Sequence, residues 1–246
     1  MKAIILAAGY ATRLYPLTKN KPKPLLEVGG RPIVEHIMDK LGDLDVVDEV
    51  FVVTNNKFFT YFLEWKSGFE SETKITIVND KTMSNEDRLG SLGDIRYVVE
   101  TMKVDDDIIV VAGDNLFEFS LKPMAELFAS KQRSVVALYD VKDRELARHY
   151  GIVSVCENNI ITNFEEKPIE PKSTLSSTGI YIYPKQVVEH LIAFTEQNDA
   201  DKAGNFLEWL HKQEEIHCCI ADEKWFDIGT IEQLEKARKE FKGVTR

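Results

Sequence analysis

Short runs of β-branched and other apolar residues alternate with segments of helical apolar spacing along almost the whole 246-residue chain. This alternation is typical of a mostly parallel sheet with helices on its faces, since each parallel pair needs a crossover connection. It predicts an α/β fold of three layers with a mixed, mostly parallel central sheet. The later strands lie closer together in sequence, which indicates antiparallel additions. The expected strands are residues 3–6, 49–54, 74–78, 107–112, 134–139, 152–155, 160–164, 179–183 and 217–221.

Four apolar stripes predict helices between these strands. The stripes are Ile33, Ile37 and Leu41; Ile95, Val98, Val99 and Met102; Val187, Val188, Leu191 and Ile192; and Ile231, Leu234, Ala237 and Phe241. Two helices also carry the spacing of a capping box or its near variant, with Ser91 three residues before Asp94 and Thr230 three before Gln233. Because no internal or hexapeptide repeat is found, we expect one domain over residues 1–246 without a C-terminal left-handed β-helix.

Composition excludes several classes of protein. The formal net charge of −10 argues against a nucleic-acid-binding or anionic-membrane-binding surface. No apolar run approaches the roughly 20 residues that span a bilayer, and the apolar start of the chain is interpreted as a strand rather than a signal peptide. The cysteines, Cys156, Cys218 and Cys219, lack the spacing of a zinc site or a disulfide framework. We therefore expect a cytoplasmic protein; the sequence leaves open whether it is a homo-oligomer.

The first loop is chemically unlike the rest of the chain. Residues 10–31 hold five cations and one anion, a local charge of +4, which leaves −14 for the remainder. Four of the eight prolines lie in this stretch or directly after it and stiffen it against helix formation. A cationic loop after a buried strand of an α/β sheet suits a phosphate ligand. The order of residues fits neither the P-loop nor the GxGxxG pattern, so kinase-type and dinucleotide chemistry are poorly supported.

The loop resembles the signature of a known family. The string Leu6-Ala-Ala-Gly-Tyr-Ala-Thr-Arg-Leu-Tyr-Pro-Leu-Thr18, followed by Lys21-Pro-Lys-Pro-Leu25, is similar to the GxGTRLxPLT…PKP motif of the sugar-1-phosphate nucleotidylyltransferases, of the glucose-1-phosphate thymidylyltransferase type. The resemblance implies a Rossmann-like nucleotidyltransferase domain. It also implies that Arg13 contacts the transferring phosphate and Lys23 the phosphate oxygens. The residues it implies around base and phosphates are Leu6, Ala8, Gly9, Ala11 and Thr12. Ala11 departs from the motif, which has glycine there, and a methyl group restricts φ and crowds the approach of a ligand.

Two aspartates are candidate metal ligands. Asp114 follows a buried strand within Gly-Asp-Asn, which places its carboxylate at the edge of the sheet where ligands bind. Asp227 lies between bulky apolar residues and precedes Gly229 and the expected cap Thr230. Either could instead serve a turn or cap, but the resemblance implies that the two jointly hold catalytic Mg²⁺, a cation that takes hard oxygen ligands. A third acidic group, residues 105–107, precedes a strand and is interpreted as a solvated turn.

Other segments match the sites for the second substrate and for the base. Glu166 and Lys167 resemble the family's EKP motif, which implies that the glutamate binds sugar hydroxyls and the lysine binds the sugar phosphate. Gly151 and Gly179 match sugar-contacting segments in which the ligand approaches the backbone. Asn85 and Gly90 lie where the family reads the nucleobase, and the helix start at Gly90 is a candidate site for anionic groups. The five histidines show no ligand spacing.

The sequence thus favours a Mg²⁺-dependent enzyme that joins a nucleoside triphosphate and a sugar 1-phosphate into a nucleoside-diphosphate sugar and pyrophosphate. The alternatives are a relative that binds nucleotide or sugar phosphate without turnover, and a nucleotidyltransferase with a non-sugar acceptor such as phosphocholine. A transferase that consumes a nucleotide-sugar through residues 105–107 is a further rival. The sequence does not identify the base or the sugar.

Overall fold

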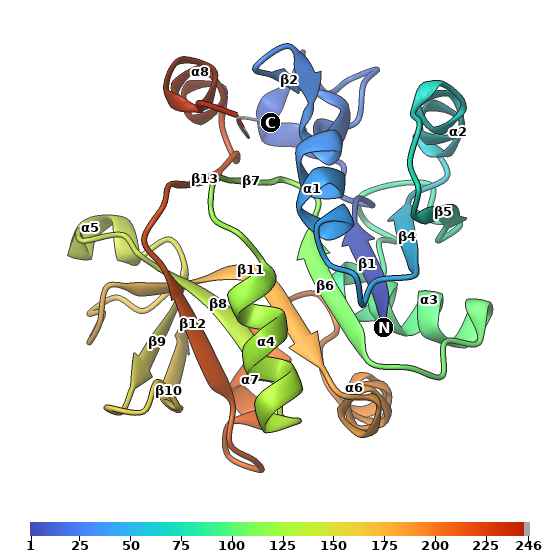
Figure 1. Ribbon diagram of the computed structural model, residues 1–246. Helices are drawn as coiled ribbons and strands as arrows, with labels where there is room; N and C mark the ends of the chain where they lie inside the picture. Colours follow the sequence, from blue (N-terminus) through green and yellow to red (C-terminus); the bar gives the residue numbers. More distant parts are fainter. Residues whose placement is uncertain (244–246) are drawn as a thin grey trace.

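The computed structural model describes residues 1–243 and contains one nine-stranded sheet with helices on both faces (Figure 1). Its main path runs β10-β9-β11-β6-β1-β4-β5, and β8 joins β11 and β12 beside it. The strands of this sheet are β1 Lys2–Leu6, β4 Glu49–Thr54, β5 Lys74–Asn79, β6 Ile108–Ala112, β8 Val135–Asp140, β9 Gly151–Val155, β10 Ile161–Glu166, β11 Leu175–Tyr183 and β12 His217–Ala221. Two short two-stranded sheets are β2 Glu27–Val28 with β3 Arg31–Pro32, and β7 Asn115–Phe117 with β13 Trp225–Asp227.

The central strands are parallel, and the additions are mixed. β1 pairs in parallel with both β4 and β6, and β5 adds to β4 in parallel. β11 is antiparallel to β6, while β12 is parallel to β8. The carboxyl ends of β1 and β6 therefore lie side by side, and the loops that follow them emerge at one edge of the sheet.

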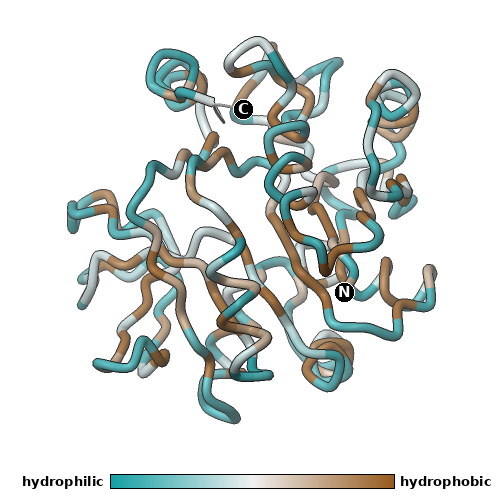
Figure 2. Tube along the Cα trace, in the orientation of Figure 1, coloured by the Kyte–Doolittle hydropathy of each residue, from teal (hydrophilic) through white to brown (hydrophobic). Residues whose placement is uncertain are grey.

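The sheet separates two apolar cores because its strands alternate sides. Ala3 and Ile5 of β1 enter one core and Ile4 enters the other. The first core is closed by α1 Ile33–Gly42, α2 Phe59–Gly68, α4 Lys122–Lys131 and α8 Ile231–Glu240, and the second by α3 Gly90–Met102, α6 Lys185–Gln197 and α7 Ala203–Leu210. Figure 2 shows that the most hydrophobic segments coincide with the buried strands of the sheet. The predicted three-layer α/β architecture is confirmed.

All nine expected strands are present, but several element boundaries differ. β11 begins at Leu175, four residues before the expected start, because its first half pairs with β8 and β9 before it reaches β6. The strands β2, β3, β7 and β13 were not predicted, since two or three residues are too short to show an alternating pattern. Two short 3₁₀ turns, Thr12–Leu14 and Lys23–Leu25, and the four-residue helix α5 Arg144–Ala147 complete the described elements.

One of the two predicted helix caps is wrong. Thr230 caps α8 as expected, with its hydroxyl accepting a hydrogen bond from the Gln233 N–H at 3.2 Å. Ser91 instead lies inside α3, which begins at Gly90 and has no side-chain cap. Its backbone N–H donates to the Asp201 carbonyl at 3.0 Å, and the Leu92 N–H donates to the Ala200 carbonyl at 2.9 Å. A segment far away in sequence thus satisfies the donors that a local cap would have satisfied.

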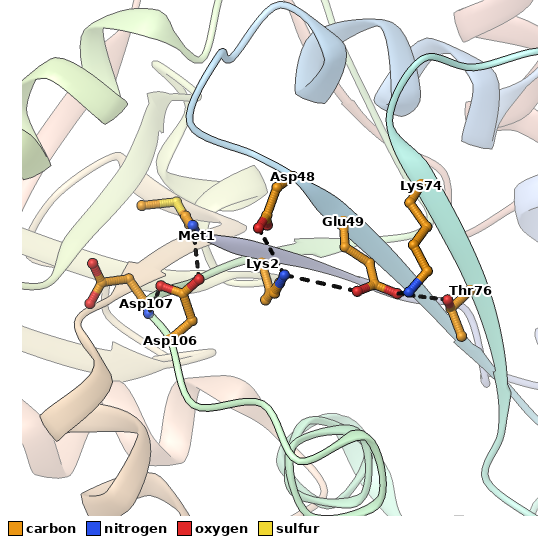
Figure 3. Close-up of polar contacts among 8 residues, drawn as sticks. All are labelled: Met1, Lys2, Asp48, Glu49, Lys74, Thr76, Asp106 and Asp107. Carbon is orange, nitrogen blue, oxygen red and sulfur yellow. Dashed lines mark hydrogen bonds and ion pairs between the residues drawn. The ribbon is translucent and has the colours of Figure 1, made fainter.

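A polar cluster lies at the amino ends of the central strands, the edge opposite the loops after β1 and β6 (Figure 3). Glu49 accepts hydrogen bonds from Thr76 at 2.8 Å and forms an ion pair with Lys74 at 2.8 Å, while Lys2 binds Asp48 at 2.9 Å. The acidic residues 105–107 belong to this edge. Asp106 binds the amino group of Met1 at 3.0 Å, and Asp107 accepts from the backbone N–H of Lys185. Residues 105–107 precede β6 as expected, but only Asp105 is exposed; Asp106 and Asp107 are half-buried in these contacts, so the segment is not the solvated turn that was predicted.

Among residues 1–243, no helix is both long and apolar enough to cross a membrane.

Candidate active site

A cleft of about 950 Å³ lies at the carboxyl edge of β1 and β6, and a smaller cavity of about 270 Å³ adjoins it. The two share a wall that includes Asp114, Tyr150, Lys167 and Asp227. Every residue that the resemblance assigned to substrates or to the metal lines one cavity or both. The larger cleft holds Leu6, Ala8, Gly9, Ala11, Thr12, Arg13, Lys23, Asn85, Gly90, Asp114, Lys167 and Asp227, and the smaller adds Gly151, Glu166 and Gly179.

The loop after β1 is fixed by an unusual backbone conformation at Ala11. This residue has φ 47° and ψ 43°, in the left-handed region where an L side chain is strained. The buried hydroxyl of Thr18 donates to the Ala11 carbonyl at 2.7 Å and holds the turn closed. The turn presents Arg13 to solvent at the rim of the cleft. Within residues 1–243, the guanidinium of Arg13 makes no hydrogen bond or ion pair, so its donors are available to a ligand.

Lys23 is a buried cation that already faces a carboxylate. The two prolines beside it stiffen the short 3₁₀ turn Lys23–Leu25, and only 11% of its side chain is exposed. Its ammonium group donates to Asp114 Oδ2 at 2.7 Å. A charged hydrogen bond of this length fixes both side chains against the floor of the cleft.

The two candidate metal ligands are brought together by the small sheet of β7 and β13. In this antiparallel pair Asp227 lies opposite Asn115, the residue directly after Asp114. The buried amide of Asn115 locks the pair, since it accepts from Trp225 Nε1 at 2.9 Å and donates to the Thr178 carbonyl. Burial and, to a smaller extent, the negative charge of Asp114 raise the pKa of Asp227 to about 6. Lys23 and the other nearby cations lower it, but by less. The paired carboxylates therefore favour an added cation.

The smaller cavity is walled by the end of β10 and the start of α7. Glu166 is the last residue of β10, opposite Gly151 on β9. The following residue, Lys167, has φ 48°, and its backbone N–H donates to the Tyr150 carbonyl at 3.0 Å. Among the described residues the Lys167 ammonium has no hydrogen bond or ion pair, and it faces both cavities. Glu166 Oε1 lies 3.7 Å from the ammonium group of Lys202. This wall offers a hydroxyl acceptor beside cations.

The far end of the larger cleft is formed by residues 85–94. Asn85 and Gly90 lie there as expected, but the first N–H groups of α3 are engaged by the Asp201 and Ala200 carbonyls. The expectation that this helix start receives anionic groups is therefore wrong for Ser91 and Leu92. Beneath the loop, burial raises the pKa of Asp94 to about 8, with Asp80 beside it adding to the shift. The buried Asp94 Oδ1 has no hydrogen-bond partner in the described chain.

Several residues of the site were missed by sequence reasoning. Arg88 was interpreted as part of a capping loop, and Asp201 and Lys202 lie in a polar stretch, residues 198–202, that looks like an ordinary connection. All three line the cavities. Arg88 and Asp201 are 113 positions apart, so no local spacing relates them. Asn115 was visible beside Asp114, but only its burial and partners reveal its positioning role.

Comparisons with known proteins agree with this geometry. The family model described as nucleotidyl transferase matches residues 2–243. The bifunctional protein GlmU of Methanocaldococcus jannaschii is 31% identical over 97% of this chain, which spans 54% of that relative's length. The UTP–glucose-1-phosphate uridylyltransferase AglF of Haloferax volcanii is 28% identical over 100% of this chain and 98% of its own.

Solved structures have the same fold. A putative glucose-1-phosphate thymidylyltransferase from Bacillus anthracis, solved in complex with a sucrose, superposes with a TM-score of 0.84 and 28% identity, over 97% of this chain and 94% of that one. A UDP-glucose pyrophosphorylase complexed with UDP-glucose superposes with a TM-score of 0.80 and 22% identity, over 97% of each chain.

Proposed function

The chain belongs to the nucleotidyl transferase family and is a nucleotidyltransferase, and from this premise we propose that it joins a nucleoside triphosphate to a sugar 1-phosphate. The products are a nucleoside-diphosphate sugar and pyrophosphate. The observation that carries the proposal is the pair of adjoining cavities, whose shared wall holds Asp114, Asp227 and Lys167. We assign the larger cavity to the triphosphate and the smaller to the sugar phosphate, so that nucleophile and α-phosphate meet at that wall.

The chemistry needs placement and charge neutralisation more than a general base. An oxygen of the sugar phosphate attacks the α-phosphorus, the bond to the leaving pyrophosphate breaks, and the pyrophosphate carries away the electron pair. Arg13 and Lys23 stabilise the negative charge that develops on the transferring and leaving groups. Glu166 accepts hydrogen bonds from sugar hydroxyls, and Lys167 pairs with the sugar phosphate. Gly151 and Gly179 let the sugar approach the backbone, while Asn85 and Gly90 flank the base.

The donor set fits Mg²⁺. Asp114 and Asp227 supply hard oxygen ligands, and burial together with the neighbouring Asp114 carboxylate raises the pKa of Asp227, which supports a site that an added cation would stabilise. Within residues 1–243, no group of three or more metal-ligating side chains is found, so substrate phosphates and water would complete the coordination. Such a cation would neutralise phosphate charge in the reaction.

Lys23 gives the two carboxylates an internal counter-ion until substrate binds. Its ammonium group lies 2.7 Å from Asp114 Oδ2, and the stiff turn that carries it leaves only the side chain to move. We infer that incoming phosphates draw the ammonium away from Asp114. The carboxylate then gains a free oxygen at the moment when the phosphates arrive.

A pyrophosphate-release screen tests the proposal. Purified protein with Mg²⁺ is offered each of dTTP, UTP, CTP and GTP against a panel of hexose 1-phosphates, with phosphocholine as a non-sugar acceptor. We expect pyrophosphate with one or more hexose 1-phosphates. Saturable triphosphate binding without pyrophosphate would instead favour a non-catalytic relative, and release with phosphocholine alone would favour the non-sugar acceptor. Consumption of a nucleotide-sugar without pyrophosphate is not expected, because residues 105–107 lie at the opposite edge of the sheet.

Replacing either carboxylate tests the assigned metal ligands. Asp114→Asn and Asp227→Asn each remove a charged oxygen ligand while keeping the side-chain shape, so we expect pyrophosphate release to fall by at least about 10²-fold. Circular dichroism and urea unfolding should show an intact fold. Asp105→Asn, at the opposite edge of the sheet, is the matched control and should retain activity. Full activity in Asp114→Asn or Asp227→Asn would overturn the assignment of that residue.

We propose that the reaction takes place in one nucleotidyltransferase domain, because no internal repeat divides the sequence, and in the cytoplasm, because the cysteines lack the spacing of a disulfide framework.

A further inference from the structure

The segment between α6 and α7, residues 198–202, lies between the two cavities and contacts the walls of both. On one side, the carbonyls of Ala200 and Asp201 accept hydrogen bonds from the first turn of α3 at 2.9 and 3.0 Å. The fit is close, because a Cβ on Gly90 would lie 2.3 Å from Asp201 Cα. The contact therefore depends on glycine at position 90, where φ is +77°. We call residues 198–202 the connecting segment.

A two-pronged ion pair reinforces this contact. Arg88 donates to both oxygens of Asp201, from Nε at 2.9 Å and from Nη2 at 3.0 Å. Its remaining nitrogen, Nη1, donates to the Asn85 carbonyl at 2.8 Å. One guanidinium thus joins the loop assigned to the nucleobase to the connecting segment. The two parallel bonds fix direction as well as distance, since the guanidinium is planar.

The other side of the connecting segment forms the sugar wall. Lys202 follows Asp201 directly, and its ammonium group lies 3.7 Å from Glu166 Oε1. Two residues later, Gly204 packs so closely that a Cβ there would lie 2.9 Å from Glu166 Oε2. Three residues of backbone thus separate Asp201 from the close contact between Gly204 and the carboxylate assigned to the sugar.

We propose that Arg88 and Asp201 are a positioning pair that couples the two substrate sites. This inference rests on the proposed function. The pair holds the base loop and the Glu166 wall at a fixed separation, so ordering of one by its substrate also orders the other. The reciprocal effect follows, because two ligands that share a coupling free energy raise each other's affinity by the same factor. Neither side chain needs to contact the reacting atoms.

Calorimetric titration measures this coupling without turnover. The affinity for the triphosphate is measured in EDTA, with and without a saturating hexose 1-phosphate. The probes are the pair with the highest turnover in the screen, or UTP and glucose 1-phosphate if none turns over. For the wild type we expect the second ligand to tighten binding of the first by about 5-fold or more, the lower end of typical allosteric coupling. In Arg88→Gln and Asp201→Asn this factor should fall to near one.

Steady-state kinetics and a variant that exchanges the two charges distinguish a loss of positioning from a general loss of structure. Arg88→Gln should raise the KM for the hexose 1-phosphate, whose assigned residues Arg88 does not contact, more than it lowers kcat. The double variant Arg88→Glu with Asp201→Arg should recover part of the lost coupling. Arg96→Gln is the matched control, since Arg96 makes a comparable ion pair between α3 and α6, with Glu196 at 3.2 Å, but lines neither cavity.

Different results would overturn the positioning pair and the proposed function. Equal coupling in the wild type and in Arg88→Gln, no coupling in the wild type, or an equal loss in Arg96→Gln would each overturn the positioning pair. Coupling that is present without pyrophosphate release would overturn the proposed function and leave the positioning pair standing.

Discussion

Ala11 lies where the family motif has glycine, and it adopts the backbone conformation that glycine favours. The backbone of Ala11 is held at φ 47° because the Thr18 hydroxyl donates a hydrogen bond to the Ala11 carbonyl. The sequence alone marked this position as a departure, and the structure identifies its cost as backbone strain.

We therefore expect Ala11→Gly to stabilise the protein by about 1 kcal/mol, the strain of one left-handed residue less the added flexibility of glycine in the unfolded chain. Urea unfolding measures the change. The matched control is Ala8→Gly, at a buried position whose φ is not positive, which should lose stability. A less stable Ala11→Gly variant would show that the turn is not strained.

The buried carboxyl group of Asp94 makes the stability of the protein depend on pH. Its pKa is about 8 in the folded protein and 3.8 where the side chain is not buried. At any pH between these two values, folding is therefore accompanied by uptake of a proton. The stability that Asp94 contributes is thus present at low pH and is lost as pH rises toward 8, by up to about 1.4 kcal/mol per pH unit.

Asp94→Asn keeps a hydrogen-bond donor for Asp80 but cannot ionise, so its stability should fall less steeply between pH 5 and pH 8 than that of the wild type. Urea unfolding at several pH values measures both curves. Asp45→Asn, on an exposed loop, serves as the control. Parallel curves for Asp94→Asn and the wild type would show that Asp94 is ionised in the folded protein.

At the scale of elements, strands of five residues or more were predictable because their apolar residues mark a buried sheet. Asp114 was found in this way, since it follows such a strand directly. The partner sheet of β7 and β13 was not predictable, because three residues carry no period. The contact of α3 with the connecting segment was also hidden, and a local capping pattern at Ser91 pointed to the wrong partner. Pairings over long sequence separations set these parts of the site.

The packing of α7 against β10 yields a prediction about the second substrate. In Gly204→Ala the new methyl group would lie 2.9 Å from both Glu166 Oε2 and the Phe164 ring, so it must displace the Glu166 carboxylate. We expect the KM for the hexose 1-phosphate to rise about tenfold, the effect of one misplaced methyl group, with the KM for the triphosphate unchanged.

Gly204 is the second residue of α7 and its φ is not positive, so the helical backbone accepts alanine there and the fold should be preserved. Gly42→Ala, at the open end of α1, is the control. An unchanged KM for the sugar phosphate would show that Glu166 does not bind it.

At the scale of the whole molecule, the sheet has a substrate edge and a structural edge. The polar cluster around Glu49 lies at the amino ends of the strands (Figure 3). The cavities lie at their carboxyl ends. Burial alone would raise the pKa of Glu49, but hydrogen bonds from Lys74 and Thr76 lower it below 4.5. Its contribution to stability is therefore present above pH 4.5 and is lost as pH falls through the lowered value.

Glu49→Gln should cost about 1 kcal/mol at pH 7, a modest loss because Lys74 is exposed, and the difference from wild type should vanish in acid. The ratio kcat/KM should be unchanged. Unfolding curves at pH 7 and at a series of pH values below 4.5, together with the pyrophosphate assay, measure the two effects, with the exposed Glu72→Gln as control. A large loss of activity with intact stability would mean that the two edges are not independent.

β11 is hydrogen-bonded along both of its edges and joins the strands on either side of it into one sheet. It pairs with β8 along one side, and along the other it pairs first with β9 and then with β6. A register shift between Ser177 and Tyr181 surrounds Gly179, which lines the smaller cavity. A strand that pairs with β6, β8 and β9 leaves no boundary at which the part assigned to the nucleotide and the part assigned to the sugar could be exchanged as separate modules. We therefore expect a change of acceptor to require substitutions in the cavity walls themselves.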